Sequence, residues 1–77
     1  MPGPAAPEVP IRDDMIRLGQ FLKLAGLAES GADARALLED GGVRVNGEPE
    51  QRRGRQLVRG DEIEVSLPGG VERAVVA

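Results

Sequence analysis

The chain has 77 residues, a formal net charge of −3 and 40% hydrophobic residues, which suits one small domain rather than two. It contains no Cys and no His, which excludes disulfides, thiolate nucleophiles, nearly all structural zinc sites and the usual general base near neutral pH. A carboxylate-based enzyme is the remaining catalytic alternative, and in so short a chain we expect neither an enzyme nor a cofactor.

The N-terminal segment carries no signal for export or membrane insertion. No apolar run approaches the ~20 residues that span a bilayer, and the chain does not begin like a signal peptide. Together with the absence of Cys, this fits a cytoplasmic protein without a membrane partner. Residues 1–10 hold four of the six prolines, which predicts a flexible leader before a domain at residues 11–77. Residues 11–17 are ambiguous between short extended pieces and a segment with a capping Asp.

A first helix is predicted over residues 18–27. Apolar residues repeat there at i, i+3, i+4 and i+7, and so share one face of a helix. They are Leu18, Phe21, Leu22 and Ala25. Gly26 is a natural residue for the helix end, because the position after a helix often needs a positive φ.

A second helix is better marked at both ends. Ser30 is a suitable N-cap, with Asp33 three residues further on, and Gly41-Gly42 ends the segment. The apolar stripe between them consists of Ala34, Leu37 and Leu38. Only a few residues join the two predicted helices, so we expect them to pack as a helix–turn–helix pair.

Short strands are predicted after the helices. Residues 43–45 alternate apolar and polar side chains, and Asn46-Gly47 is the strongest two-residue hairpin signal. Residues 48–50 should return as a short edge strand, because Pro49 has no amide hydrogen for a central ladder.

The C-terminal third continues this pattern of strands and turns. Residues 57–58 form an apolar patch, and residues 59–61 predict a turn. Residues 62–65 alternate, with Ile63 and Val65 expected to face inward, and residues 68–70 begin a last hairpin that closes with residues 71–76. Helices followed by strands predict an α+β fold.

These segments resemble the RNA-binding domain named after small-subunit ribosomal protein S-four, also called the alpha-L motif. The resemblance rests on Arg17-Leu18-Gly-Gln-Phe-Leu22, on Ser30-x-x-x-Ala34-x-x-Leu37-Leu38, on Gly41-Gly-Val43-x-Val45-Asn46-Gly47 and on Val58-x-Gly60-Asp61-x-Ile63. Within that family the chain is most similar to small stand-alone bacterial members. The resemblance implies two helices packed on a small twisted sheet, and structured RNA, ribosomal or transfer RNA, as the partner. It also implies no chemistry of the domain's own, since family enzymes carry a separate catalytic domain.

Two residues depart from the family pattern. Gly31 stands where a basic residue commonly follows the capping Ser, so one implied phosphate contact is missing. Gly19 stands where an acid is often found. Arg35 matches a position that is frequently basic in the family and remains a candidate for RNA contact.

Arginines are concentrated in residues 51–60, which read QRRGRQLVRG and contain no acid. Lys and Arg supply most nucleic-acid affinity by contacting phosphates, so this distribution matters more than the net charge. The predicted RNA-binding residues are Lys23, Arg35, Arg44, Arg52, Arg53, Arg55 and Arg59. A solvated arginine-rich loop, an Arg35–Glu39 surface pair and an ordinary helix-surface position for Lys23 are the alternative interpretations.

The sequence favours a monomeric, non-catalytic RNA-binding module with little base-specific readout. Its single aromatic residue, Phe21, is expected in the core, so a base-stacking platform is not expected. A protein–protein adaptor of the same fold is an alternative, because the net charge of −3 and Gly31 oppose RNA binding. Arginines gathered into one patch would favour RNA, and scattered arginines would favour the adaptor. A ubiquitin-like sulfur carrier is a further alternative, although Gly69-Gly70 is internal rather than C-terminal.

Overall fold

The computed structural model describes residues 6–77, which form two helices and seven strands. In chain order these are β1 (Glu8–Val9), β2 (Met15–Arg17), α1 (Leu18–Leu24), α2 (Gly31–Glu39), β3 (Val43–Val45), β4 (Glu48–Pro49), β5 (Gln56–Val58), β6 (Glu62–Leu67) and β7 (Gly70–Val76). Five strands form a sheet in the order β1-β7-β6-β3-β4, and β2 pairs with β5 separately. The predicted α+β class is confirmed.

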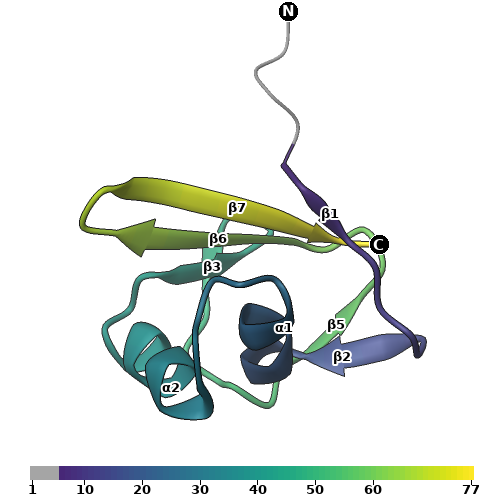
Figure 1. Cartoon of the computed structure of the whole chain (residues 1–77), viewed down its shortest axis with the longest axis horizontal. Coiled ribbons are helices and arrows are strands. Elements are labelled where there is room, and N and C mark those ends of the chain that lie inside the picture. The colour runs from purple at the N-terminus through teal and green to yellow at the C-terminus, as the bar shows by residue number, and fades with distance from the viewer. Residues whose placement is uncertain (1–5) are drawn as a thin grey trace, which may run out of the picture.

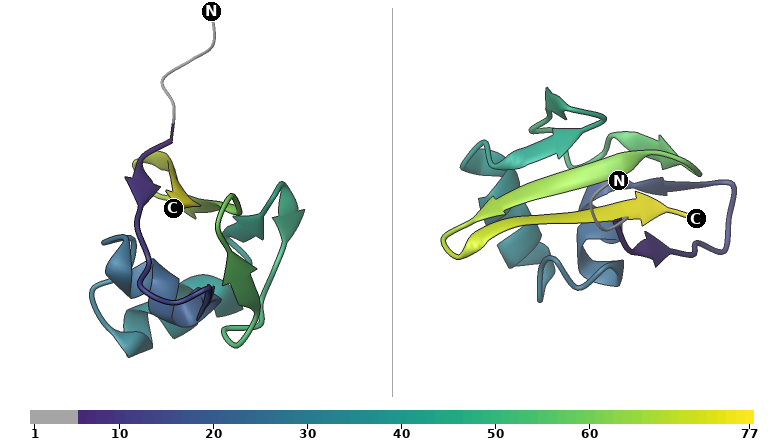
Figure 2. Two further views of the ribbon diagram at one scale, coloured as in Figure 1. Left: turned by 90° about the vertical axis from the view of Figure 1, so that its right-hand side faces the viewer. Right: turned by 90° about the horizontal axis from the view of Figure 1, so that it is seen from above.

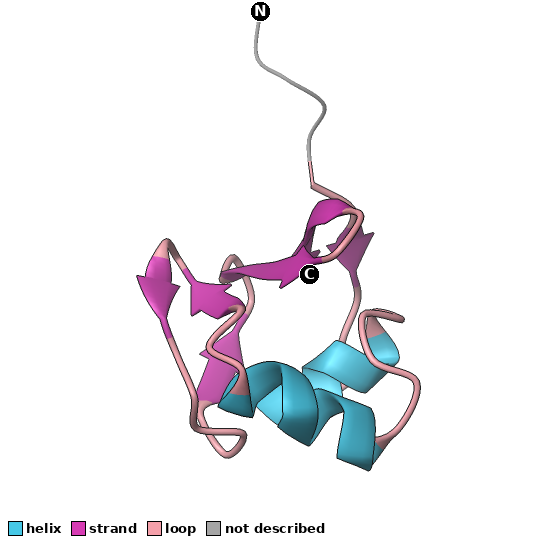
Figure 3. Ribbon diagram, turned by 90° about the vertical axis from the view of Figure 1, so that its left-hand side faces the viewer, coloured by secondary structure: helices cyan, strands magenta, loops and turns pink. Residues whose placement is uncertain are grey.

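Both helices lie on the same face of the five-stranded sheet, as Figures 1 and 3 show. The view onto the sheet in the right panel of Figure 2 shows that neither helix covers its other face. The core between the layers is aliphatic apart from Phe21, which is fully buried with its α1 neighbours Leu18 and Leu22. Ile63 and Val65 of β6 are also fully buried, which confirms their predicted inward orientation. Neither α1 nor α2 has the length and apolar composition needed to cross a membrane.

The start of α2 follows the predicted cap, whereas α1 ends earlier than predicted. Ser30 Oγ accepts a hydrogen bond of 3.1 Å from the amide of Asp33, so the predicted N-cap of α2 is confirmed. Helix α1 ends at Leu24, three residues before the predicted end, and Gly26 follows with φ of +75°. Neither Asp13 nor Asp14 caps α1, because residues 15–17 are extended and pair with β5.

The Asn46-Gly47 turn between β3 and β4 is confirmed, since both residues have positive φ, 51° and 84°, as a type I′ turn requires. The Asn46 side chain also joins this turn to the start of β6. Its Nδ2 donates to Asp61 Oδ1 at 3.0 Å, and its Oδ1 accepts from the amide of Glu62 at 2.9 Å. The predicted edge strand and last hairpin are present as β4 and as the antiparallel pair β6–β7.

The sheet begins inside the segment predicted to be a flexible leader. Glu8 and Val9 pair in parallel with Val75 and Val76 of β7, and Ile11 just beyond them is buried in the core. The partner strand lies at the other end of the chain, so no local pattern indicates the pairing. Residues 1–5, the remainder of the predicted leader, lie outside the described residues.

Candidate nucleic-acid interface

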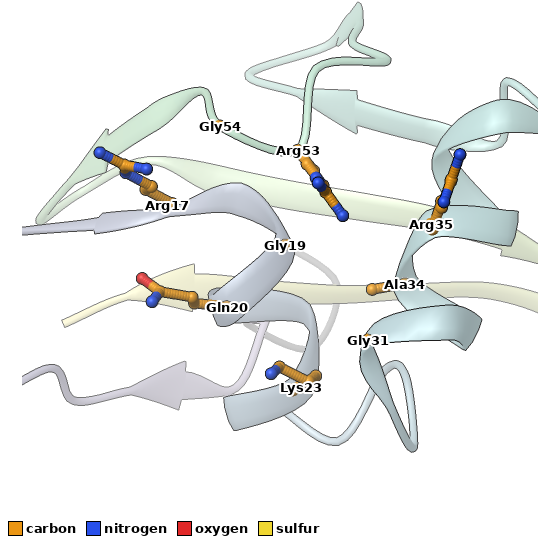
Figure 4. A pocket seen from close by; sticks show the side chains of 9 residues that line it. All are labelled: Arg17, Gly19, Gln20, Lys23, Gly31, Ala34, Arg35, Arg53 and Gly54. Atoms are coloured by element: carbon orange, nitrogen blue, oxygen red, sulfur yellow. The ribbon is translucent and has the colours of Figure 1, made fainter.

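A pocket of about 370 Å³ lies where α1, α2 and the loop of residues 50–55 meet (Figure 4). It is lined by Arg17, Gly19, Gln20, Lys23, Gly31, Ala34, Arg35, Arg53 and Gly54. Four of these residues are cationic and none is acidic, although the whole chain has a net charge of −3. We call this pocket the basic groove. Its charge suits an anionic ligand, and several nearby cations suit a polyanion.

Two backbone hydrogen bonds fix the 50–55 loop against the start of α1. The amide of Leu18 donates to the carbonyl of Arg55 at 2.8 Å, and the amide of Gly19 donates to the carbonyl of Arg53 at 2.9 Å. The first amides of a helix have no partner within the helix, so these carbonyls satisfy groups that otherwise need a cap or water. The same contacts place the Arg53 side chain in the basic groove.

The cations of the groove come from three parts of the chain (Figure 4). Arg53 extends from the loop into the space between the helices, with Arg17 and Lys23 on the α1 side and Arg35 on the α2 side. Arg35 Nε donates to Glu39 Oε1 at 3.1 Å, so the surface pair given above as an alternative interpretation is present. Both side chains are exposed, and exposed pairs of this kind contribute little energy.

The side chains of Arg52 and Arg55 bind the carboxylate of Glu50 and do not line the basic groove. The carboxylate of Glu50, only 7% exposed, accepts hydrogen bonds from Arg52 Nη2 at 3.0 Å and from Arg55 Nη1 at 3.2 Å. Hydrogen bonds from Arg52 lower the pKa of Glu50 from 4.5 to about 2, against the opposing effect of burial. Glu50 in turn raises the pKa of Arg52. The acid and the two arginines therefore form one charged cluster inside the loop.

The last two predicted residues lie on other surfaces. Arg59 Nη2 donates to the carbonyl of Ile11 at 3.0 Å, and its Nη1 lies 3.6 Å from Asp14 Oδ1, so Arg59 fastens the segment before β2. Arg44 is exposed in the middle of β3, opposite Glu64 of β6. The structure thus brings Lys23, Arg35 and Arg53 together at the groove and leaves Arg44, Arg52, Arg55 and Arg59 outside its lining.

Sequence reasoning missed Arg17 and Gln20 as lining residues. In the sequence, Arg17 stands out only as part of a family motif. Arg17, Gln20 and Lys23 are nevertheless spaced three residues apart. Residues three apart lie near one another along a helix surface, so this spacing was the available signal. Within residues 6–77 no group of three acidic side chains lies close enough together to hold a metal ion.

Two comparisons with known proteins identify the family of this chain. A family model described as the S4 domain matches residues 9–73. A protein of Bacillus subtilis (strain 168) named "Probable ribosome maturation protein RlbA" is 49% identical over 57 residues, which cover 74% of this chain and 80% of that protein. Both findings confirm the resemblance seen in the sequence. The chain belongs to the S4 domain family.

Proposed function

We propose that this protein binds structured RNA of the ribosome or of ribosome assembly, docking the cations of the basic groove on backbone phosphates. The observation that carries the proposal is a groove lined by Arg17, Lys23, Arg35 and Arg53 and by no acid, in a chain that is acidic overall. Membership of the S4 domain family supports RNA as the ligand. The name of the Bacillus subtilis relative supports a role in ribosome maturation.

The mechanism is electrostatic and shape-based. Each phosphate neutralised by Arg or Lys releases counterions, which makes the affinity fall steeply with salt. Four groove cations give an expected log–log salt slope of about −3. Arg52 and Arg55 add less to this slope, because Glu50 already neutralises part of their charge. No catalytic step is part of the proposal.

The adaptor alternative predicts arginines scattered over the surface. Cations meet here from the end of β2, the last turn of α1, the α2 helix and the 50–55 loop, which supports RNA over an adaptor. Arg73, on β7, does not line the groove and is paired with Glu64 at 3.4 Å. Its substitution removes an exposed arginine outside the groove and therefore supplies a control.

The test compares an Arg17→Gln/Arg53→Gln variant with Arg73→Gln and the wild type. Each protein is cross-linked to total cellular RNA, the bound RNA is sequenced, and affinity for the enriched RNA is measured at several salt concentrations. We expect enrichment of ribosomal RNA by the wild type, a loss of at least about 10-fold in affinity for the groove variant, and an unchanged Arg73→Gln protein. Absence of enrichment by the wild type would reject the proposal and favour the adaptor.

A further inference from the structure

Glu50 occupies an unusual place in the part of the chain that the structure describes, because it is the only charged or polar residue there that is buried. Its carboxylate accepts hydrogen bonds from the backbone amides of Gln51 at 3.1 Å and Arg52 at 3.3 Å. Oε2 also accepts from Arg52 Nε at 3.2 Å, and Oε1 accepts from Arg52 Nη2 and Arg55 Nη1. The loop that follows Glu50 is therefore folded around one carboxylate.

The same loop carries Arg53 into the basic groove. Glu50 is itself fixed to the sheet, because its amide donates to the carbonyl of Val43 at 3.0 Å. On the other side, the carbonyls of Arg53 and Arg55 accept from the first amides of α1. Arg53 thus lies between an anchor to the sheet and an anchor to the helix, and its own side chain has no part in the carboxylate cluster. A loop whose backbone is already fixed loses less entropy when one of its side chains meets a ligand.

We propose that Glu50, although it has the same charge as RNA, is a positioning residue that strengthens RNA binding by holding Arg53 in the basic groove. This inference rests on the proposed function. It opposes the simple electrostatic expectation, in which removing any acid near the groove strengthens attraction for a polyanion. It also opposes a masking role, in which Glu50 merely occupies Arg52 and Arg55 and keeps them from phosphates.

The two roles predict opposite signs for the same substitution. In a positioning role, Glu50→Gln weakens RNA binding by about 5-fold or more and makes the salt slope shallower by roughly 0.7–0.9, the share of one phosphate contact. Glu50→Asp weakens binding in the same direction without changing the net charge, because the shorter side chain does not reach both arginines. In a masking role, Glu50→Gln binds more tightly with a steeper slope, and that result would overturn the inference.

Glu48→Gln is the matched control, since it removes one acid from the exposed strand β4 two residues earlier. We expect it to bind RNA as well as the wild type or slightly better. Thermal unfolding followed by circular dichroism sets a temperature at which every variant is folded, and all affinities are measured there.

A double-variant comparison separates positioning from a general loss of structure. If Glu50 acts through Arg53, adding Glu50→Gln to Arg53→Gln weakens binding no further than Arg53→Gln alone. Additive losses would mean that Glu50 acts elsewhere and would contradict the inference. If the wild type binds RNA and Glu50→Gln binds it equally well, the inference alone is wrong. If the wild type binds no RNA, the proposed function is wrong as well.

Discussion

Gly19 and Arg53 are in direct backbone contact: the Gly19 amide donates to the Arg53 carbonyl at 2.9 Å, and a Cβ on Gly19 would lie 3.2 Å from the Arg53 Cβ. This is closer than an ordinary van der Waals contact, so the loop approaches α1 as it does because residue 19 has no side chain. The glycine departs from the acid often found at this family position. In this chain Gly19 leaves room for the close approach of Arg53, and the groove lining carries no negative charge at this position.

The first prediction is that Gly19→Ala separates stability from RNA binding. Ala favours a helix interior by about 1 kcal/mol over Gly, but Gly19 lies in the first turn of α1, so this gain offsets only part of the cost of the close contact and we expect a small loss in the free energy of unfolding. The added methyl group displaces Arg53, and we expect RNA affinity to fall about 3- to 10-fold. Urea unfolding and RNA titration measure the two quantities.

Gly69→Ala is the control for that prediction, because it makes the same chemical change in the β6–β7 turn, where an added Cβ meets no atom within 4 Å. We expect normal RNA affinity for this variant. If Gly19→Ala also binds RNA like the wild type, the close contact does not position Arg53.

The features predicted well from the sequence are those with a local cause. The Ser30 cap needs only the amide of Asp33, and the Asn46-Gly47 turn needs only two residues that tolerate positive φ. The alternation of β6 likewise identified Ile63 as a core residue. Each of these signals lies within a few residues of the structure it specifies.

Two features could not be predicted, for different reasons. The pairing of Glu8 with Val75 joins opposite ends of the chain, so no local pattern indicates it. The partners of Glu50 are near in sequence, but residues 48–50 predict a short return strand, and that pattern does not indicate a loop folded back around a buried carboxylate. The sequence predicts RNA contact for Arg52, Arg53 and Arg55 alike, whereas in the structure Arg52 and Arg55 bind Glu50 and only Arg53 lines the groove.

The second prediction concerns Gly31, the position where the family commonly has a basic residue. Gly31 lines the basic groove at the start of α2, and an added Cβ would meet no atom within 4 Å. We expect Gly31→Lys to raise RNA affinity about 3- to 10-fold at low salt and to steepen the salt slope by roughly 0.7–0.9. The cost is about 0.3–1 kcal/mol of stability, because a cation at a helix N-terminus opposes the helix dipole.

Gly31→Ala serves as the uncharged control and should leave both affinity and slope unchanged. Salt titrations of the three proteins on one RNA measure the effect. Unchanged binding by Gly31→Lys would mean that RNA does not reach the α2 side of the groove.

The third prediction concerns Asn46, which has φ of 51° and side-chain hydrogen bonds to Asp61 and to the amide of Glu62. Asn46→Ala loses both hydrogen bonds and strains the backbone, so we expect a loss of about 1–3 kcal/mol in the free energy of unfolding. Asn46→Gly loses only the hydrogen bonds and should cost less, because glycine tolerates this φ. Equal losses in urea unfolding would show that the backbone conformation contributes nothing.

The fourth prediction is a pH dependence that originates at Glu50. Its pKa in the folded protein is about 2, below the value of 4.5 for an unperturbed carboxyl, because Arg52 and Arg55 donate to the ionised form. The unfolded state therefore takes up a proton at a higher pH than the folded state does. The stabilisation from the ionised carboxylate is complete above about pH 4.5 and is lost as the pH falls toward 2.

The measurement compares urea unfolding of the wild type and Glu50→Gln at pH 6 and at pH 3. Other carboxylates titrate alike in both proteins, so the difference in unfolding free energy between them isolates Glu50. We expect Glu50→Gln to be clearly less stable than the wild type at pH 6 and the gap to narrow at pH 3, since at pH 3 the unfolded wild type takes up a proton at Glu50 while the folded wild type largely keeps this carboxylate ionised. A gap that stays constant with pH would show that the arginines stabilise this site through shape and neutral hydrogen bonds rather than through the charge of Glu50.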